Sequence, residues 1–307
     1  MTSQPLNSLR DHWPEYLIEA AGLGLFMISA GTIATLLEYP QSSIHHAIAD
    51  PLLRRALMGL AMGATLAGLV YSPWGRQSGA HFNPVVTLTF FRLGKVATWD
   101  AVFYIVAQLA GGLAGVLLLL VVIGEAFGRP PVEFVVTVPG PAGQLAAFAA
   151  ELLTSFGLML TVLYTTNRVA LMRYTGLFAA LLLALYITFE SPLSGTSMNP
   201  ARTVASALPS GTWQGLWIYL VAPLIGMLAA ADAYRLLTGR SNVMCAKLNH
   251  ITHRRCIFVR CWFKEHAVDV PRLAAQQSQR GAFVVTVPGP AGQLAAFVAE
   301  LSSHRSR

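Results

Sequence analysis

Six long apolar segments, separated by shorter polar stretches, dominate the pattern of the chain. A helix needs roughly 20 residues at about 1.5 Å each to cross a hydrocarbon core. The pattern therefore predicts six membrane-spanning helices, of which the second and the fifth are short. The predicted helices cover residues 16–37, 56–71, 101–124, 144–164, 174–189 and 213–237.

A polar loop and a further short apolar run follow each of the two short segments. These runs, residues 84–93 and 200–208, are too short to span a membrane, and each begins at the proline of an Asn-Pro pair. Short, interrupted segments at corresponding places in two halves of a chain indicate a transport protein whose site lies near the membrane midplane.

Composition supports the membrane class. The 307 residues are 54% hydrophobic and 11% charged, whereas soluble domains carry about 25% charged residues. Residues 1–13 are polar and the first apolar run is too long for a signal peptide, so we expect no cleaved signal. The net charge of +7 comes from basic residues at predicted helix ends and in the C-terminal tail. Membrane topology explains that charge, and we expect no nucleic-acid partner.

The two halves of the chain repeat one motif. Residues 78–85 read SGAHFNPV and residues 194–201 read SGTSMNPA. Each motif lies downstream of a predicted helix that carries one acid, Glu19 or Glu151. With three spanning helices in each half, the second motif must enter the membrane from the opposite side, which makes an inverted repeat. We divide the chain into an N-terminus (1–13), two repeats (14–130 and 131–240) and a tail (241–307).

The Asn-Pro pairs, Asn83-Pro84 and Asn199-Pro200, have a direct physical meaning. Proline suits the first turn of a helix, where its missing N–H costs nothing, and asparagine before it is a strong N-cap. The unpaired N–H groups and the positive end of the helix dipole then point into whatever the helix start faces. A plain capped turn would explain either pair alone but is a poor account of both.

The loops SGAHFNPV and SGTSMNPAR resemble the two signature loops of the aquaporin (major intrinsic protein) superfamily, over a frame from about Trp13 to Arg240. The resemblance implies an all-α membrane protein with six transmembrane helices and two re-entrant half-helices in an inverted repeat. It also implies a homotetrameric passive channel rather than an enzyme, with no cofactor. In the family the two half-helix starts meet at the midplane, where water passes in single file and cations are repelled. Val85 replaces the family's usual alanine. The midplane residues would be Asn83, Pro84, Val85, Asn199, Pro200 and Ala201.

The resemblance also places an outer constriction, the selectivity filter. Counting from the second motif, its positions fall on Ile187, Thr196 and Arg202. The second-helix position falls on Met62 if one residue is inserted after that helix, and on Gly63 if none is. An arginine in a membrane segment is costly and usually functional; in the family it donates hydrogen bonds to permeants and repels cations.

This filter fits neither familiar pattern of the family. Water-selective members show Phe and His beside the arginine, whereas Ile187 has no imidazole. Glycerol facilitators show Trp and an Asp after the arginine, whereas Thr203 follows Arg202. We therefore expect a channel for water and small neutral solutes such as glycerol or urea, which excludes ions and protons.

Four further polar residues acquire roles from the resemblance. Glu19 and Glu151 would accept hydrogen bonds from loop N–H groups that lipid cannot satisfy, and Gln108 matches another loop-supporting position. A proton relay through the two glutamates is the rival interpretation. His81 belongs to the first signature loop, and we expect it to line the inner vestibule without a metal.

Two other function classes are compatible with broken helices. A secondary carrier of a small solute would also show inverted repeats, but it needs a coupling site, for which only the paired glutamates are available. A non-conducting structural membrane protein is known in the superfamily. Measured conductance separates both from a channel.

The distribution of arginine and lysine predicts the orientation. With a cytoplasmic N-terminus most loop charges lie inside, and only Arg54, Arg55 and Arg129 lie outside. This agrees with the positive-inside rule, with Arg54 and Arg55 as the discordant pair. We expect a bacterial-type member in the plasma (inner) membrane, with both termini in the cytoplasm.

The tail, residues 241–307, is basic and holds all three cysteines. Its thiols and imidazoles are ligand types that bind zinc, but their spacing fits no standard zinc finger. We favour a basic segment that contacts anionic lipid beside the membrane. The candidate metal ligands are Cys245, His250, His253, Cys256, Cys261 and His266.

The tail also contains a second repeat. Residues 283–301 copy residues 134–152 except at one position, where Val298 replaces Ala149. An ancient half-repeat would have diverged further, so we expect a recent local duplication or an artefact. We predict that deleting residues 276–307 leaves permeability unchanged.

Overall fold

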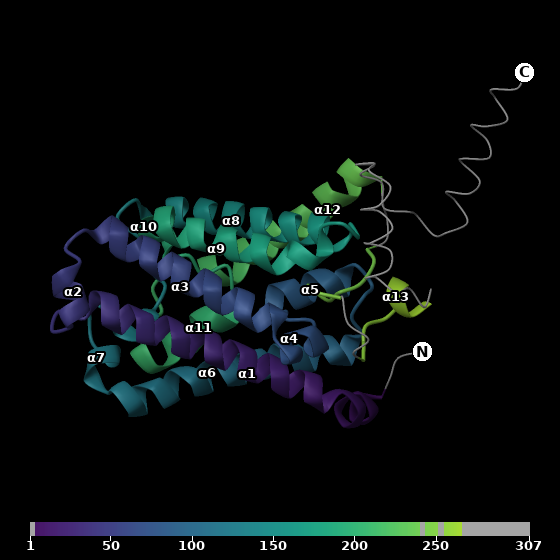
Figure 1. Cartoon of the computed structure of the whole chain (residues 1–307), viewed down its shortest axis with the longest axis horizontal. Coiled ribbons are helices and arrows are strands. Elements are labelled where there is room, and N and C mark those ends of the chain that lie inside the picture. The colour runs from purple at the N-terminus through teal and green to yellow at the C-terminus, as the bar shows by residue number, and fades with distance from the viewer. Residues whose placement is uncertain (1–3, 240–242, 251–254, 266–307) are drawn as a thin grey trace, which may run out of the picture.

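A computed structural model describes residues 4–239, 243–250 and 255–265. Six long helices form one bundle (Figure 1). All six are long and apolar enough to cross a membrane, which confirms the predicted six-helix membrane fold. The helices are α1 (Pro5–Glu38), α3 (Pro51–Tyr71), α6 (Thr98–Ile123), α8 (Gly143–Thr166), α9 (Thr175–Phe189) and α12 (Leu216–Thr238).

The first helix differs most from its predicted bounds. The apolar pattern starts α1 at residue 16, whereas the helix begins at Pro5 and runs without interruption to Glu38. Apolar character marks only the part that lipid can surround, while a helix continues through polar residues until a cap or breaker ends it. Residues 5–13 are therefore part of the first helix rather than a separate N-terminal segment.

The two half-helices begin at the Asn-Pro pairs, as predicted. They are α5 (Pro84–Arg92) and α11 (Pro200–Ser210), and each follows a short helix, α4 (Pro73–Ser78) or α10 (Ser191–Ser194). The connecting loops have the same backbone: φ is positive at Gly79, Ala80 and Phe82, and again at Gly195, Thr196 and Met198. Such values are uncommon outside glycine, so their repetition at matching positions shows that the two halves fold alike.

The spanning helices pair where glycine lets two backbones touch. A Cβ at Gly111 of α6 would lie 2.0 Å from the carbonyl oxygen of Ala20 in α1. A Cβ at Gly226 of α12 would lie 2.4 Å from the carbonyl oxygen of Leu152 in α8. These pairs join the first and third spanning helices of each half, so the small-residue packing typical of membrane helices repeats with the sequence.

The bundle has two distinct ends (Figure 1). We call one the tail end, because the N-terminus, α4 and the described part of the tail with α13 (Trp262–Glu265) lie there. We call the other the far end, where α2 (Ser43–Ala47) and α7 (Glu125–Gly128) lie. The remaining short elements are η1 (Glu133–Val135) and η2 (Met172–Tyr174).

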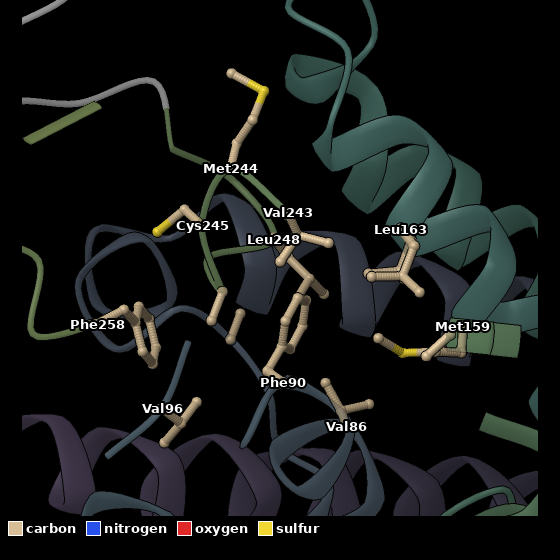
Figure 2. Close-up of a cluster of buried hydrophobic side chains, with 14 of the residues drawn as sticks. Val86, Phe90, Val96, Met159, Leu163, Val243, Met244, Cys245, Leu248 and Phe258 are labelled. Atoms are coloured by element: carbon tan, nitrogen blue, oxygen red, sulfur yellow. The ribbon is translucent and has the colours of Figure 1, made fainter. Parts of the chain in front are cut away.

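The described tail is packed into the tail end of the bundle (Figure 2). Leu248 and Phe258 join one hydrophobic cluster with Val86, Phe90 and Val96. Lys247 is also buried, and its ammonium group donates to the carbonyl oxygens of Arg76 at 2.9 Å and Arg255 at 2.6 Å. The lipid-contact interpretation is therefore wrong for residues 243–250, because their apolar side chains find protein partners.

Candidate functional site

The two half-helix starts hold each other through their asparagines. Asn83 Nδ2 donates to the carbonyl oxygen of Met198 at 2.7 Å, and Asn199 Nδ2 donates to that of Phe82 at 2.8 Å. The amide oxygens cap their own helices: Asn83 Oδ1 accepts from the Val85 N–H at 2.9 Å, and Asn199 Oδ1 accepts from the Ala201 N–H at 3.1 Å. One N–H of each asparagine is thus used between the loops, and an amide has two.

Pro84 and Pro200 occupy the first turns of their helices, and Val85 and Ala201 are buried directly after them. The six predicted midplane residues therefore lie together where α5 and α11 start. With both starts facing the same place, their dipoles and unpaired N–H groups raise the electrostatic potential there.

Glu19 supports the first loop from within α1. Its carboxylate is fully buried and accepts hydrogen bonds from Ser78 Oγ at 2.7 Å, from the His81 N–H at 3.1 Å and from the Phe82 N–H at 2.6 Å. Gln108 Nε2 adds a fourth at 2.8 Å. These are the contacts that a loop-supporting role requires.

Glu151 does the same for the second loop from within α8. It is fully buried and accepts from Ser194 Oγ at 2.8 Å, from the Ser197 N–H at 2.6 Å and from the Met198 N–H at 2.7 Å. Both carboxylates thus accept several hydrogen bonds from loop donors, as the loop-support prediction requires.

Two buried tyrosines brace the same loops, and the sequence reasoning missed them. Tyr104 of α6 donates to the carbonyl oxygen of Ser78 at 2.6 Å, and Tyr219 of α12 donates to that of Ser194 at 2.7 Å. Their equivalent places in the third helix of each half were the available signal. Loop position is therefore set from two helices in each half.

A cavity of about 250 Å³ opens between the second loop and the far end. A water molecule needs roughly 10–15 Å³ of such space, so the cavity holds several. Its lining includes all four residues of the predicted filter, Met62, Ile187, Thr196 and Arg202. Gly63 is not among the lining residues, and a Cβ there would lie 2.7 Å from the carbonyl oxygen of Ala180 in α9. The alternatives for the second-helix position are thus separated: Met62 faces the cavity and Gly63 packs helices.

Arg202 lines this cavity and keeps one donor unpaired. Its Nη1 is buried and makes no hydrogen bond within the described part of the chain. A buried guanidinium N–H without an acceptor is costly, so an oxygen atom that reached this group would be stabilised there.

Thr196 and Glu190 complete the polar side of the cavity. The Thr196 hydroxyl donates to Glu190 Oε2, and Ser194 Oγ lies against both Glu190 Oε1 and Glu151 Oε1, to one of which it donates its single proton. With its proton held by Glu190, the Thr196 hydroxyl can act only as an acceptor toward a molecule in the cavity. Glu190 was not predicted; it stands directly before the second loop, and no pattern set it apart.

His81 is placed differently from expectation. It was expected to line an inner vestibule, but it is buried: Nε2 lies 2.9 Å from the carbonyl oxygen of Ala246 and Nδ1 lies 3.1 Å from Thr87 Oγ1. Its ring is stacked between those of Phe90 and Phe258, with centroids 5.3 Å away on both sides. The reason is the tail, which covers the first signature loop at the tail end through Ala246 and Phe258.

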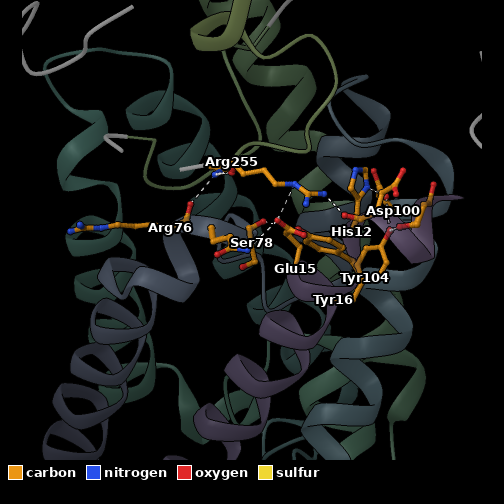
Figure 3. Close-up of polar contacts among 12 residues, drawn as sticks. His12, Glu15, Tyr16, Arg76, Ser78, Asp100, Tyr104 and Arg255 are labelled. Atoms are coloured by element: carbon orange, nitrogen blue, oxygen red, sulfur yellow. Dashed lines mark hydrogen bonds and ion pairs between the residues drawn. The ribbon is translucent and has the colours of Figure 1, made fainter. Parts of the chain in front are cut away.

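A polar network joins the tail to the start of α1 (Figure 3). Arg255 Nε lies 3.7 Å from Glu15 Oε1, and its guanidinium donates to the carbonyl oxygen of Asp11. Beside it, Asp100 accepts from Tyr16 at 2.6 Å and pairs with His12 at 2.7 Å. Since Glu15 is fully buried, Arg255 supplies a positive charge that this carboxylate needs.

Four of the six candidate tail ligands come together. The ligand atoms of Cys245, His250, Cys256 and Cys261 all lie within 4.8 Å of one another, and all four residues are buried. The other two candidates, His253 and His266, lie outside the described residues. Sequence spacing did not indicate this tetrad, because its intervals match no familiar zinc motif.

The fold and the paired half-helices define a multi-pass membrane protein built as an inverted repeat. The profile of the Major intrinsic protein family matches residues 7–234, and the chain belongs to that family.

Individual relatives agree with this assignment. The chain is 37% identical over 179 residues to a probable aquaporin NIP-type of Nicotiana alata, covering 57% of this chain and 63% of the relative. It is 36% identical over 184 residues to Nodulin-26 of Glycine max, covering 59% and 65%. The chain thus spans less than two thirds of these relatives, which are plant proteins. The bacterial-type assignment stays a prediction.

A solved structure matches the fold. The aquaglyceroporin of Plasmodium falciparum superposes with a TM-score of 0.63 at 19% identity, covering 74% of this chain and 97% of the other. At that identity the likeness extends to the fold alone.

Proposed function

We propose that the chain is a passive channel for water and small neutral solutes that excludes ions and protons. The observation that carries the proposal is Arg202, which lines a cavity together with the other three expected filter residues and whose Nη1 makes no hydrogen bond within the described part of the chain. A permeating oxygen supplies the missing acceptor, while the guanidinium charge repels cations.

The shape and polarity of the filter favour solutes larger than water. Met62 and Ile187 provide apolar walls, and donor and acceptor groups come from Arg202 and Thr196. A wall of this kind suits the carbon skeleton of glycerol or the body of urea, with hydroxyl or amide groups on the polar side. The name of the structural neighbour, an aquaglyceroporin, agrees with this proposal.

Exclusion of cations and protons rests on the paired half-helices. The starts of α5 and α11 direct two positive dipole ends to one place, and each adds unpaired N–H groups. A cation entering this region meets repulsion from both sides, and a water bound to Asn83 or Asn199 is oriented as an acceptor. The proton relay along a water file is thereby interrupted.

The carrier alternative receives less support. A carrier needs a group that binds the coupling ion, and the two candidate acids, Glu19 and Glu151, already accept several hydrogen bonds each from the loops. The non-conducting alternative finds some support in the tail that covers His81, and conductance decides it.

Assembly and placement follow from the family and the charges. We propose a homotetramer in the plasma membrane, with the tail end of the bundle in the cytoplasm. Arg76, Arg92 and Lys95 lie at that end, which agrees with the positive-inside rule.

Stopped-flow light scattering on proteoliposomes tests the channel. Because the tail covers one mouth, the full-length chain is compared with full-length Phe258→Ala, which removes the ring stacked on His81. We expect water permeability above that of empty liposomes in Phe258→Ala, and glycerol permeability as well. Water flux at the empty-liposome level in both proteins contradicts the channel; glycerol flux at that level contradicts only the solute range.

A further inference from the structure

The tetrad in the tail has the dimensions of a tetrahedral metal site. Cys245 Sγ lies 3.6 Å from Cys256 Sγ, and Cys261 Sγ lies 3.3 Å from His250 Nε2. A zinc ion with Zn–S near 2.3 Å and Zn–N near 2.05 Å places its ligand atoms roughly 3.5–3.8 Å apart. These two separations fall close to those edges, and all four ligand atoms lie within 4.8 Å of one another.

The ligand types select the metal. Three thiols and one imidazole form the Cys3His set of structural zinc sites, which are closed and four-coordinate. All four side chains are buried, as a structural site requires.

The tetrad takes its ligands from the two described ranges of the tail, which we call the first and the second piece. Cys245 and His250 belong to residues 243–250, and Cys256 and Cys261 belong to residues 255–265. Between the pieces the Trp262 N–H donates to the carbonyl oxygen of Met244 at 2.9 Å, and Lys247 Nζ donates to that of Arg255 at 2.6 Å. A metal bound by both pieces would add coordinate bonds to these hydrogen bonds and so cross-link the pieces more firmly.

Each piece contacts the tail-end mouth beneath it. From the first, Ala246 accepts from His81, and the Leu248 N–H donates to the carbonyl oxygen of Gly79 at 3.1 Å. From the second, Phe258 stacks on His81, as noted above.

The second piece also reaches the turn after α5. The Val259 N–H donates to the carbonyl oxygen of Lys95 at 2.9 Å, and Lys95 Nζ donates to that of Arg260 at 2.7 Å. The two pieces together thus cover the first signature loop and the end of its half-helix.

We propose that Cys245, His250, Cys256 and Cys261 bind one Zn²⁺ ion, and that the ion locks the tail as a plug over this mouth. A ligand that binds only one of two states shifts the equilibrium between them. When free zinc is about 100 times its dissociation constant, the ratio of plugged to open protein rises about 100-fold. The plug rests on the proposed channel; the metal site does not.

Metal content tests the site. Purified full-length protein is analysed for zinc by mass spectrometry after dialysis, and we expect about one zinc ion per chain. Cys256→Ser and Cys261→Ser should each lose it, while His253→Ala, a matched change outside the tetrad, should retain it. Cobalt in place of zinc should give the thiolate-to-metal absorption bands of a tetrahedral site. Three outcomes overturn the site. The wild-type protein contains no zinc, Cys256→Ser leaves the zinc content unchanged, or Cys245 and Cys256 form a disulfide instead of binding zinc.

Hydrogen exchange tests the plug without relying on flux. With zinc bound, amides of residues 243–250 and of the Gly79–Phe82 loop should be protected, and a chelator should increase their exchange. Equal exchange with and without the chelator overturns the lock.

Flux then separates the plug from the channel. Zinc should lower the water permeability of wild type but not of Phe258→Ala, which keeps all four ligands. High and zinc-independent flux in both proteins overturns the plug and leaves the channel intact. Flux at the empty-liposome level in both proteins contradicts the channel, and zinc content and hydrogen exchange then still decide the lock.

Discussion

Replacing Glu19 by alanine tests how the first signature loop is held. The change leaves four buried donors without their acceptor: the N–H groups of His81 and Phe82, Ser78 Oγ and Gln108 Nε2. An orphaned buried donor costs about 1–3 kcal/mol, so four cost roughly 4–12 kcal/mol. Water entering the vacated space, and a turn of Gln108 toward Thr87, which already lies 3.3 Å away, bring the loss to about 4 kcal/mol.

This loss should be visible in thermal unfolding. With an unfolding entropy of about 2.1 cal/mol/K per residue, a chain of 307 residues loses about 6 °C in midpoint for a destabilisation of about 4 kcal/mol. The measurement is a thermal scan of detergent-purified protein at one fixed rate, because membrane proteins often unfold irreversibly. Glu19→Gln, which keeps one acceptor oxygen, should fall between alanine and wild type.

A control variant and the rival proton-relay interpretation make this test specific to Glu19. Glu125→Ala removes an exposed carboxylate that pairs with Arg129 and should shift stability by less than about 0.5 kcal/mol. A proton relay predicts the reverse pattern, in which Glu19→Gln melts like wild type but loses proton flux. An alanine variant that melts within about 1 °C of wild type and conducts normally would refute the loop-support argument.

Three further predictions follow from the same geometry. Arg202→Val should raise glycerol permeability and cation permeability in flux assays, each by about tenfold if the lost barrier is about 1.4 kcal/mol. Arg129→Val, measured alongside, should change neither permeability. Asn83→Ala loses a cap worth about 1 kcal/mol and a cross-loop hydrogen bond worth about 1 kcal/mol, so its melting midpoint should drop by about 3 °C; an unchanged midpoint would show that the loops do not depend on each other. Deleting residues 276–307 should leave water permeability equal to wild type, and a clear fall or rise would give that repeat a role.

The bundle could be predicted from the sequence because its determinants are local. Apolar runs mark the membrane-spanning helices, and an Asn-Pro pair specifies a capped helix start. The six spanning helices and the two half-helices could therefore be located. The main error, the start of α1 at Pro5, arose because lipid exposure ends before the helix does.

The contacts that join distant parts of the chain could not be predicted in this way. His81 contacts Ala246, which lies 165 residues further along the chain. No periodicity of the sequence predicts such a contact. The same holds for the discordant pair of arginines: Arg54 binds Glu38 at 3.1 Å and Arg55 donates to the carbonyl oxygen of Thr188 at 3.3 Å. Their charges serve contacts at the far end, which a topology rule based on counting does not describe.

The paired flux of water and glycerol tests the central claim most directly. Full-length protein in proteoliposomes, with a zinc chelator present, is measured by stopped-flow light scattering against empty liposomes, under an osmotic gradient of an impermeant sugar and then of glycerol. A channel with the filter of Met62, Ile187, Thr196 and Arg202 predicts that both permeabilities exceed those of empty liposomes and do not saturate with concentration. Permeabilities equal to those of empty liposomes, in wild type and in Phe258→Ala alike, would contradict it.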